Sequence, residues 1–159
     1  TRNPQLATRN SMLTVREHVD LPVPVEDVFA YMDAPAHQPV ITPSLTRSEL
    51  VERLPGGGAR VRYTYRLLGL SFSGEVRATD YAPNERIVWT MTGDLQGTLR
   101  WYFESPDGAA RSRFTYAATY AVPGPALVRP LLAPLVRRYN EREVHRTLHN
   151  LRSRLVEGG

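Results

Sequence analysis

The chain has 159 residues, of which 42% are hydrophobic, as is usual for one globular domain. It contains no cysteine, which excludes disulfides, thiol nucleophiles, iron–sulfur clusters and thiolate zinc sites. All twenty basic residues are arginine, so lysine Schiff-base chemistry and the phosphate-binding lysine of a P-loop are excluded as well.

The net charge of +4 is small, and the arginines are spread along the chain with acidic residues near them. We expect no nucleic-acid binding, because its usual signature is a clustered basic stripe together with a docking motif. No apolar run approaches the roughly 20 residues of a membrane span, and residues 1–11 are too polar for a signal peptide. We therefore expect a cytoplasmic protein. Residues 1–11 are expected to be a disordered leader, a misplaced start or a cloning remnant, followed by one domain over residues 12–159.

The first elements follow from alternation and from proline. Residues 13–21 alternate between apolar and polar side chains, which predicts a strand that ends before Pro22 and Pro24. Apolar residues then recur at helical spacing over residues 25–32, which predicts a short amphipathic helix with Glu26 and Asp27 in its first turn. Residues 33–43 contain three prolines and are expected to form a corner or lid with at most a turn or two of helix.

Six further strands are predicted before the final helix. Residues 45–54 alternate poorly, and their assignment rests on the proline-glycine turn at residues 55–58. Clearer alternation follows over residues 60–68, 72–78, 87–91, 99–103 and 111–122. The predicted inner faces are aromatic, and the candidate ligand-binding residues on them are Tyr63, Tyr65, Phe72, Trp89, Trp101, Phe103, Tyr116 and Tyr120. Such faces line either a thick core or a ligand pocket, and the buried phenols, which need partners, favour a cavity with polar groups at its wall.

The stretch from residue 125 to residue 157 is helical in pattern, but its apolar stripe changes face. Pro130 and Pro134 explain the change if they divide it into a short first piece and a main helix that starts near Pro134. On that helix the face of Val144 and Leu148 carries Arg137, Asn140 and Glu141 in its first turns. These polar residues are expected to point toward the sheet or the cavity mouth.

Glu17 is a candidate acid or base. It shares the phase of Val15 and Val19 on the first strand, so it either enters an apolar space, where it needs a partner, or lies at an exposed strand edge. Its plausible partners are Arg137 and the inward tyrosines. Glu17 and Arg137 are therefore the two weak candidates for catalysis.

A metal site is not expected. His145 and His149 are four residues apart with Glu141 one turn before them, but Arg146 stands where a zincin motif has its glutamate. A solvated helix edge explains the histidines better. The three glycines at residues 56–58 precede a strand rather than a helix, so they do not form a phosphate loop, and we expect no cofactor.

Two segments resemble a known family. Residues 19–32, VDLPVPVEDVFAYM, are similar to the "aPvedVfayl" opening of the START-like superfamily, and residues 147–157, TLHNLRSRLVE, are similar to its "tLenLkrlvE" ending. This superfamily includes the polyketide cyclase/dehydrase, lipid-transport and coenzyme Q-binding families. The resemblance covers residues 13–157 and implies an α+β helix-grip fold. In that fold a curved, seven-stranded antiparallel sheet wraps around a long C-terminal helix, with short helices between strands 1 and 2 and an apolar cavity that opens near His37.

The resemblance also implies a function class, because members bind lipids, quinones, sterols, hormones or aromatic polyketides, and some catalyse cyclisation or dehydration. The leading expectation is a carrier or sensor of an apolar small molecule that needs no cofactor. The first alternative is a cyclase or dehydratase in which Glu17 or a tyrosine acts as acid/base and Arg137 steadies an enolate. The second is an accessory module that forms a protein contact, such as a homodimer, through Leu132, Leu135 and Tyr139.

Overall fold

The computed structural model describes residues 12–106 and 110–157. Its seven strands form one antiparallel sheet in the order β1-β7-β6-β5-β4-β3-β2. The expected leader, residues 1–11, lies outside the described residues. The elements in chain order are β1 (Met12–Leu21), α2 (Val25–Met32), η1 (Pro35–His37), α3 (Gln38–Ile41), β2 (Leu45–Arg53), β3 (Ala59–Leu67), β4 (Leu70–Ala82), β5 (Arg86–Gly93), β6 (Gly97–Glu104), β7 (Ser112–Ala121) and α4 (Arg129–Glu157).

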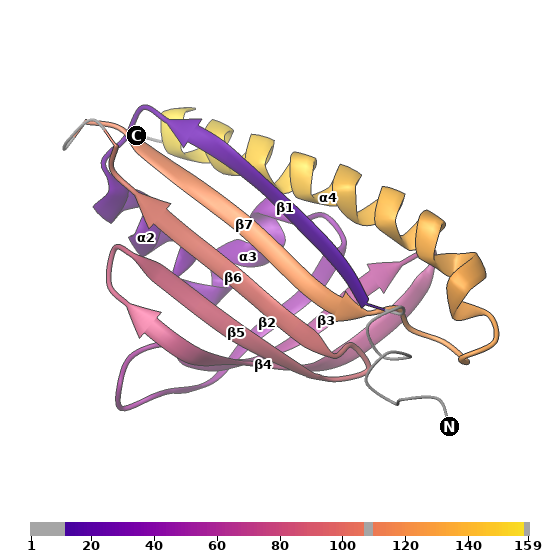
Figure 1. Ribbon diagram of the computed structural model, residues 1–159. Coiled ribbons are helices and arrows are strands. Elements are labelled where there is room, and N and C mark those ends of the chain that lie inside the picture. The colour runs from indigo at the N-terminus through magenta and orange to yellow at the C-terminus, as the bar shows by residue number, and fades with distance from the viewer. Residues whose placement is uncertain (1–11, 107–109, 158–159) are drawn as a thin grey trace, which may run out of the picture.

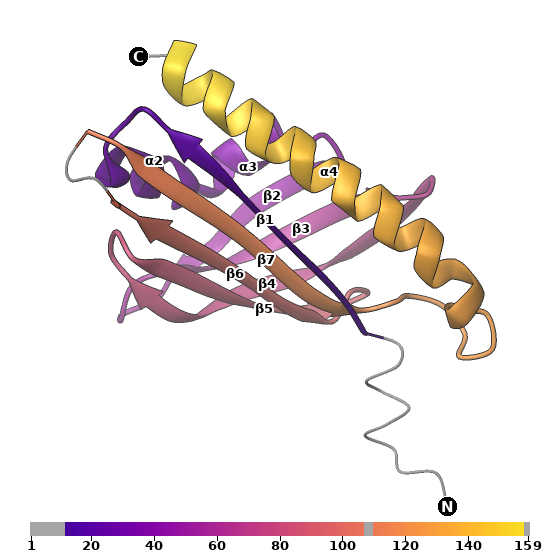
Figure 2. The ribbon, with the colours of Figure 1, turned by 45° about the horizontal axis from the view of Figure 1, so that its top comes forward.

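The sheet curves, and α4 lies along its concave side beside β1 (Figure 1). β1 and β2 are the two edges of the sheet, and the chain passes from one edge to the other through α2, η1 and α3. A second view shows that α4 runs the length of the sheet (Figure 2). The short helices begin at the end of the sheet where β1 ends. This is the helix-grip fold that the resemblance predicts, and the prediction is confirmed.

Helix α2 closes one end of the core. Pro24 stands at its N-cap with extended backbone, and Glu26 and Asp27 lie in the first turn, where the positive end of the helix dipole favours carboxylates. Val28 and Phe29 are buried on the face that packs toward β6 and β7. The ring of Phe29 meets the ring of Phe103 edge-on at a centroid distance of 5.0 Å.

The final helix differs from the prediction. The structure has one continuous helix from Arg129 to Glu157, with Pro134 inside it, so the predicted division into two pieces is wrong. Pro130 stands in the first turn, where a missing amide hydrogen costs little, and Pro134 is exposed, so water can reach the carbonyl that it leaves unpaired. The continuous helix also changes which residues face inward: Arg137 and Glu141 are exposed, whereas the buried residues are Val136, Glu143, Val144, Thr147, Leu148 and Leu151.

Strand β4 is longer than its sequence pattern indicates. It runs over thirteen residues and pairs with β3 on one side and β5 on the other. An irregularity in its pairing with β5 between Ala78 and Asp80 shifts the phase of the strand, which explains why alternation does not reveal its C-terminal part. In the described part of the chain, no helix is long and apolar enough to cross a membrane.

Candidate functional site

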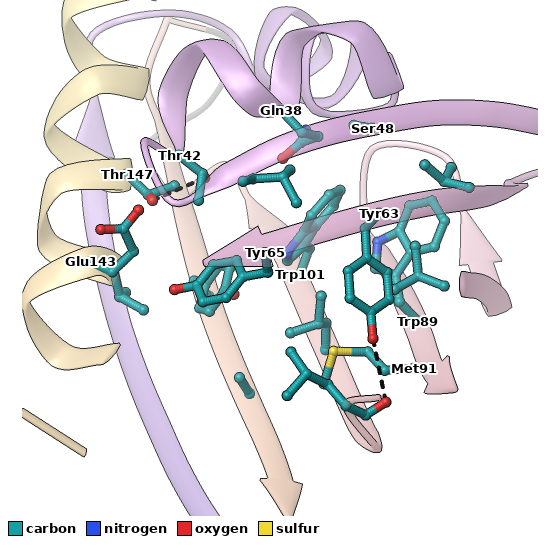
Figure 3. A pocket seen from close by; sticks show the side chains of 18 of the residues that line it. Gln38, Thr42, Ser48, Tyr63, Tyr65, Trp89, Met91, Trp101, Glu143 and Thr147 are labelled. Atoms are coloured by element: carbon teal, nitrogen blue, oxygen red, sulfur yellow. Dashed lines mark hydrogen bonds between the residues drawn. The ribbon is translucent and has the colours of Figure 1, made fainter. Parts of the chain in front are cut away.

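A cavity of about 150 Å³ lies between the concave face of the sheet, α4 and the corner that contains η1 and α3. An engineered cavity of roughly this size in another protein binds benzene. Most of the wall is apolar or aromatic, and polar side chains enter it from the corner and from α4 (Figure 3). The wall consists of Val15, Met32, Asp33, Pro35, Gln38, Thr42, Leu45, Ser48, Val61, Tyr63, Tyr65, Leu67, Val76, Trp89, Met91, Leu95, Leu99, Trp101, Tyr116, Ala118, Tyr120, Asn140, Glu143, Val144 and Thr147.

The structure brings most of the predicted aromatic residues together around this cavity. Those in the wall are Tyr63, Tyr65, Trp89, Trp101, Tyr116 and Tyr120. Phe103 lies outside it, because Phe29 and Phe114 surround its ring in the core beneath α2. Phe72 lies outside it too, packed against the buried cluster that contains Leu67. Alternation along a strand therefore indicates which side chains face inward, but it does not distinguish residues of the cavity wall from residues of the core.

Two indole rings form one side of the wall. Trp89 on β5 and Trp101 on β6 are both buried and meet edge-on, with ring centroids 5.4 Å apart. Figure 3 shows the two rings side by side in the wall, near Tyr63 and Tyr65. Neither indole Nε1 has a hydrogen-bond partner among the described residues.

Tyr63 shows the opposite arrangement, because its hydroxyl is paired within the protein. It donates to the backbone oxygens of Thr92, at 3.3 Å, and Leu95, at 3.4 Å. Gly74 leaves room for this contact, since a Cβ atom at that position would lie 2.9 Å from the Tyr63 hydroxyl and 2.0 Å from the oxygen of Thr92. Burial raises the pKa of the Tyr63 phenol, so it stays protonated at neutral pH.

The side of the cavity nearest α4 is more polar. The Tyr65 hydroxyl donates to Oδ1 of Asn140 at 3.4 Å. Burial raises the pKa of Tyr116 to about 12, with the carboxylate of Glu143 adding to the effect, and burial also raises the pKa values of Tyr65 and Tyr120. All three phenols are therefore neutral hydrogen-bonding groups at physiological pH.

The cavity wall contains two carboxylates, Asp33 and Glu143, and Glu143 is the more deeply buried, at only 5% exposed. Its Oε1 accepts a hydrogen bond of 2.7 Å from the backbone N–H of Ser44. One turn further along α4, the hydroxyls of Thr147 and Thr42 lie 3.0 Å apart, as Figure 3 shows. These contacts hold the segment after α3 against α4 and so fix one side of the cavity.

The chain matches the family described as polyketide cyclase / dehydrase and lipid transport over residues 12–156. This match extends over nearly the whole chain. The protein belongs to this family.

Solved structures of the family's fold resemble this one closely in shape and weakly in sequence. A protein of Thermus thermophilus has a TM-score of 0.79 and 20% identity, covering 92% of this chain and 99% of its own. The Zhui aromatase/cyclase from a Streptomyces species has a TM-score of 0.73 and 18% identity, covering 93% and 98%. A START superfamily protein of Mycobacterium smegmatis has a TM-score of 0.73 and 16% identity, covering 92% and 99%. No curated protein matches the sequence. At these identities the similarity shows the fold.

Within this polyketide cyclase/dehydrase-family fold, the two predicted catalytic residues lie outside the cavity wall. Glu17 has a side chain 37% exposed, and its Oε1 lies 3.6 Å from Nε2 of His145 on α4. Arg137 is exposed on α4, and in the described part of the chain no ion pair joins it to Glu17. In place of the expected pairing with Arg137 or an inward tyrosine, Glu17 contacts His145 at the rim between β1 and α4.

Two of the four histidines of this family member make other contacts. His145 faces Glu17, and the ring of His37 stacks on Tyr31 at a centroid distance of 4.2 Å while its Nδ1 lies 2.9 Å from the backbone oxygen of Tyr31. Over residues 12–106 and 110–157, no three His, Asp or Glu side chains gather as metal ligands.

Sequence reasoning missed the polar part of the wall. Gln38, Thr42 and Ser48 come from segments without clear periodicity, and Figure 3 shows them at the corner side of the cavity. Glu143 and Thr147 were missed for another reason. On one continuous helix they lie on the same face as Val136, Val144 and Leu151. The helical periodicity therefore predicts that they face inward, provided that the helix is taken to continue through Pro134.

Proposed function

We propose that this protein is a cytoplasmic carrier or sensor that binds an apolar small molecule in the cavity between the sheet and α4. The observation that supports the proposal is the cavity itself, which is walled mainly by apolar and aromatic side chains. Close-packed protein interiors contain few empty spaces larger than a water molecule, so a space of about 150 Å³ is unusual for a core. Binding sites for small molecules typically combine such a wall with a few placed polar groups.

The comparisons support the same class of ligand. The family description names polyketide cyclases and lipid transport, and one structural neighbour is described as an aromatase/cyclase. Polyketides and lipids share an apolar body with a few oxygen atoms. A wall that mixes aromatic rings with tyrosine hydroxyls and one buried carboxylate suits a molecule of that kind.

Native mass spectrometry of the freshly purified protein, compared with its denatured mass, tests the proposal. We expect a reproducible excess mass that is lost on denaturation. Ala118→Leu adds three carbon atoms to the wall and should remove the excess mass, whereas Ala126→Leu makes the same change at an exposed position and should retain it. A bare polypeptide mass in all three proteins, with no uptake of added small aromatic compounds, would contradict the proposal.

A second candidate function is an enzyme of the cyclase or dehydratase type, and Glu143 is the observation that favours it. A buried carboxylate beside Tyr65 and Tyr116 can take up a proton and return it to a bound ketone or alcohol. Arg137 is exposed and lies outside the wall, so it does not steady the enolate. Incubation with the molecule identified by mass spectrometry tests the idea. Conversion that Glu143→Gln abolishes while binding persists would support it, and an unchanged molecule would count against it.

A further inference from the structure

The cavity wall contains buried polar groups whose hydrogen-bonding capacity is unused. Within the described chain they are Nε1 of Trp89, Nε1 of Trp101, Nδ2 of Asn140, the hydroxyl of Tyr120 and Oδ1 of Asp33. Trp89, Trp101 and Tyr120 are each less than a tenth exposed. The Asp33 oxygen is an acceptor and lies 3.5 Å from Nη1 of Arg53. The other four groups can each donate a hydrogen bond and have no acceptor in the protein.

Unpaired donors in a buried wall are uncommon. Native proteins pair nearly all of their buried polar groups, and buried indole N–H groups usually find a partner, because leaving one unpaired costs the full desolvation of the donor. Two neighbouring indoles that both lack a partner in the same small cavity therefore need an explanation. Tyr63, in the same wall, is the contrast, because backbone oxygens of Thr92 and Leu95 already accept from its hydroxyl.

Ring size alone does not explain the two tryptophans. A core that needs only bulk is served by phenylalanine, which carries no donor, and this chain uses Phe103 and Phe114 in that way directly next to the cavity. Ordered water is the other possibility, since a buried water bridges otherwise unpaired groups when it has two to four polar partners. The rest of the wall, which includes Val61, Leu95 and Leu99, offers mainly apolar surface instead.

We infer that the natural ligand carries carbonyl-type oxygen atoms, as a cyclic ketone or quinone does, and that the indole N–H groups of Trp89 and Trp101 donate hydrogen bonds to them. The inference rests on the proposed function and narrows it, because a plain hydrocarbon chain would leave both donors unpaired. On the helix side, Nδ2 of Asn140 and the hydroxyl of Tyr120 offer donors for a second oxygen.

A matched pair of probes tests the inference directly. Indane and 1-indanone have the same rigid bicyclic skeleton, and they differ in one CH₂ group that becomes a carbonyl. The protein has no cysteine and no lysine, so the ketone meets no thiol and no lysine amine. Binding of both probes is measured by isothermal titration calorimetry to the full chain, to Trp89→Phe, to Trp101→Phe and to Tyr63→Phe.

We expect 1-indanone to bind about tenfold more tightly than indane, the difference that one well-formed hydrogen bond makes. Trp89→Phe and Trp101→Phe keep an aromatic ring and remove the donor, so each should reduce the preference for the ketone and leave the affinity for indane nearly unchanged. Tyr63→Phe is the matched control, because its hydroxyl is already paired with backbone oxygens, and it should keep the preference.

The infrared carbonyl band of bound 1-indanone gives a readout that does not depend on affinity. In the unsubstituted protein it should lie at lower frequency than in an apolar solvent, and it should move back toward that value in either tryptophan variant. Equal binding of both probes with an unshifted band would overturn the inference while the proposed function stands. Failure of both probes to bind, under conditions where the protein is folded, would instead contradict the proposed function. If one tryptophan variant does not fold, the other variant and the band position in the unsubstituted protein still decide the question.

Discussion

The side-chain carboxylate of Glu143 accepts a hydrogen bond of 2.7 Å from the backbone N–H of Ser44, which joins the middle of α4 to the segment that leads into β2. Further contacts continue along the same face of the helix. The Thr147 hydroxyl lies 3.0 Å from that of Thr42, and the Asn150 amide donates to the backbone oxygen of Ile41 at 2.9 Å. Glu143 therefore has a structural role in closing the cavity whether or not it has a chemical one.

Replacing Glu143 separates these roles. Glu143→Ala leaves the buried N–H of Ser44 without its acceptor and opens space in the wall, so the free energy of unfolding should fall by about 2 kcal/mol. Glu143→Gln keeps an oxygen at the same position and should cost less. Chemical denaturation measures the stabilities, and amide hydrogen exchange should show faster exchange over residues 42–45 in the alanine variant. Glu141→Ala, on the exposed face, is the control and should change stability by less than about 0.5 kcal/mol. Equal effects of Glu143→Ala and Glu141→Ala would contradict the role assigned to the Ser44 contact.

Much of the fold was predictable from the alternation along the strands and from the two segments, residues 19–32 and 147–157, that resemble the family. The helical spacing of Val28, Phe29 and Met32 predicted α2, and the inward phase of β3 and of β5 to β7 indicated the aromatic part of the wall. The polar part was not predictable in the same way. Residues such as Thr42 and Ser48 reach the cavity from a proline-rich corner, where neither period of two nor period of 3.6 applies, and only the folded chain brings them opposite α4.

Pro134 offers a direct test of the continuous helix. Inside a helix proline removes one hydrogen bond and its ring clashes with the carbonyl four residues earlier, so Pro134→Ala should raise the free energy of unfolding by about 1–3 kcal/mol. Pro130→Ala is the matched control, because Pro130 lies in the first turn, and its effect should be within about 0.5 kcal/mol of zero. Thermal and urea denaturation give both values. If α4 instead began at Pro134, the two substitutions would have similar small effects.

Glu17 should be dispensable for ligand binding. Its contact with His145 is long, at 3.6 Å, and partly exposed, so Glu17→Gln should change the free energy of unfolding by less than about 1 kcal/mol. Because the carboxylate lies at the rim and not in the wall, the affinity for a cavity probe such as 1-indanone should stay within about twofold. Calorimetry measures the affinity and denaturation measures the stability. A large loss of binding with unchanged stability would show that Glu17 contributes to the binding site.

The tyrosines of the wall predict a loss of stability at alkaline pH. The pKa of Tyr116 is raised from 10.0 to about 12, so the folded protein holds this phenolic proton more firmly than the unfolded chain does. The resulting stabilisation is complete below pH 10 and disappears as the pH rises toward 12, at up to about 1.4 kcal/mol per pH unit for one group. Urea denaturation across this range measures the slope, and the near-ultraviolet absorbance of tyrosinate follows ionisation. Tyr116→Phe should make the slope shallower. An unchanged slope in the variant would show that Tyr116 ionises in the folded protein as it does in water.

The predicted homodimer now rests on a smaller set of residues. Tyr139 donates to the backbone oxygen of Arg66, and Leu132 packs against the protein's own core, so neither is free to meet a second copy. Leu135 stays 53% exposed, Leu131, one turn before it, is 75% exposed, and Leu127, just before the start of α4, is 92% exposed.

An apolar stripe of this kind is covered when two copies pair, so Leu135→Asp should shift a dimer to monomer by placing a charge in the interface. Sedimentation velocity over a hundredfold range of protein concentration measures the association. Leu50→Asp introduces the same change at a leucine of similar exposure, 48%, on β2 and should leave the association unchanged. A monomer at every concentration in the unsubstituted protein would contradict the homodimer. Dissociation by Leu50→Asp and not by Leu135→Asp would instead place the contact on β2, at the opposite edge of the sheet from β1.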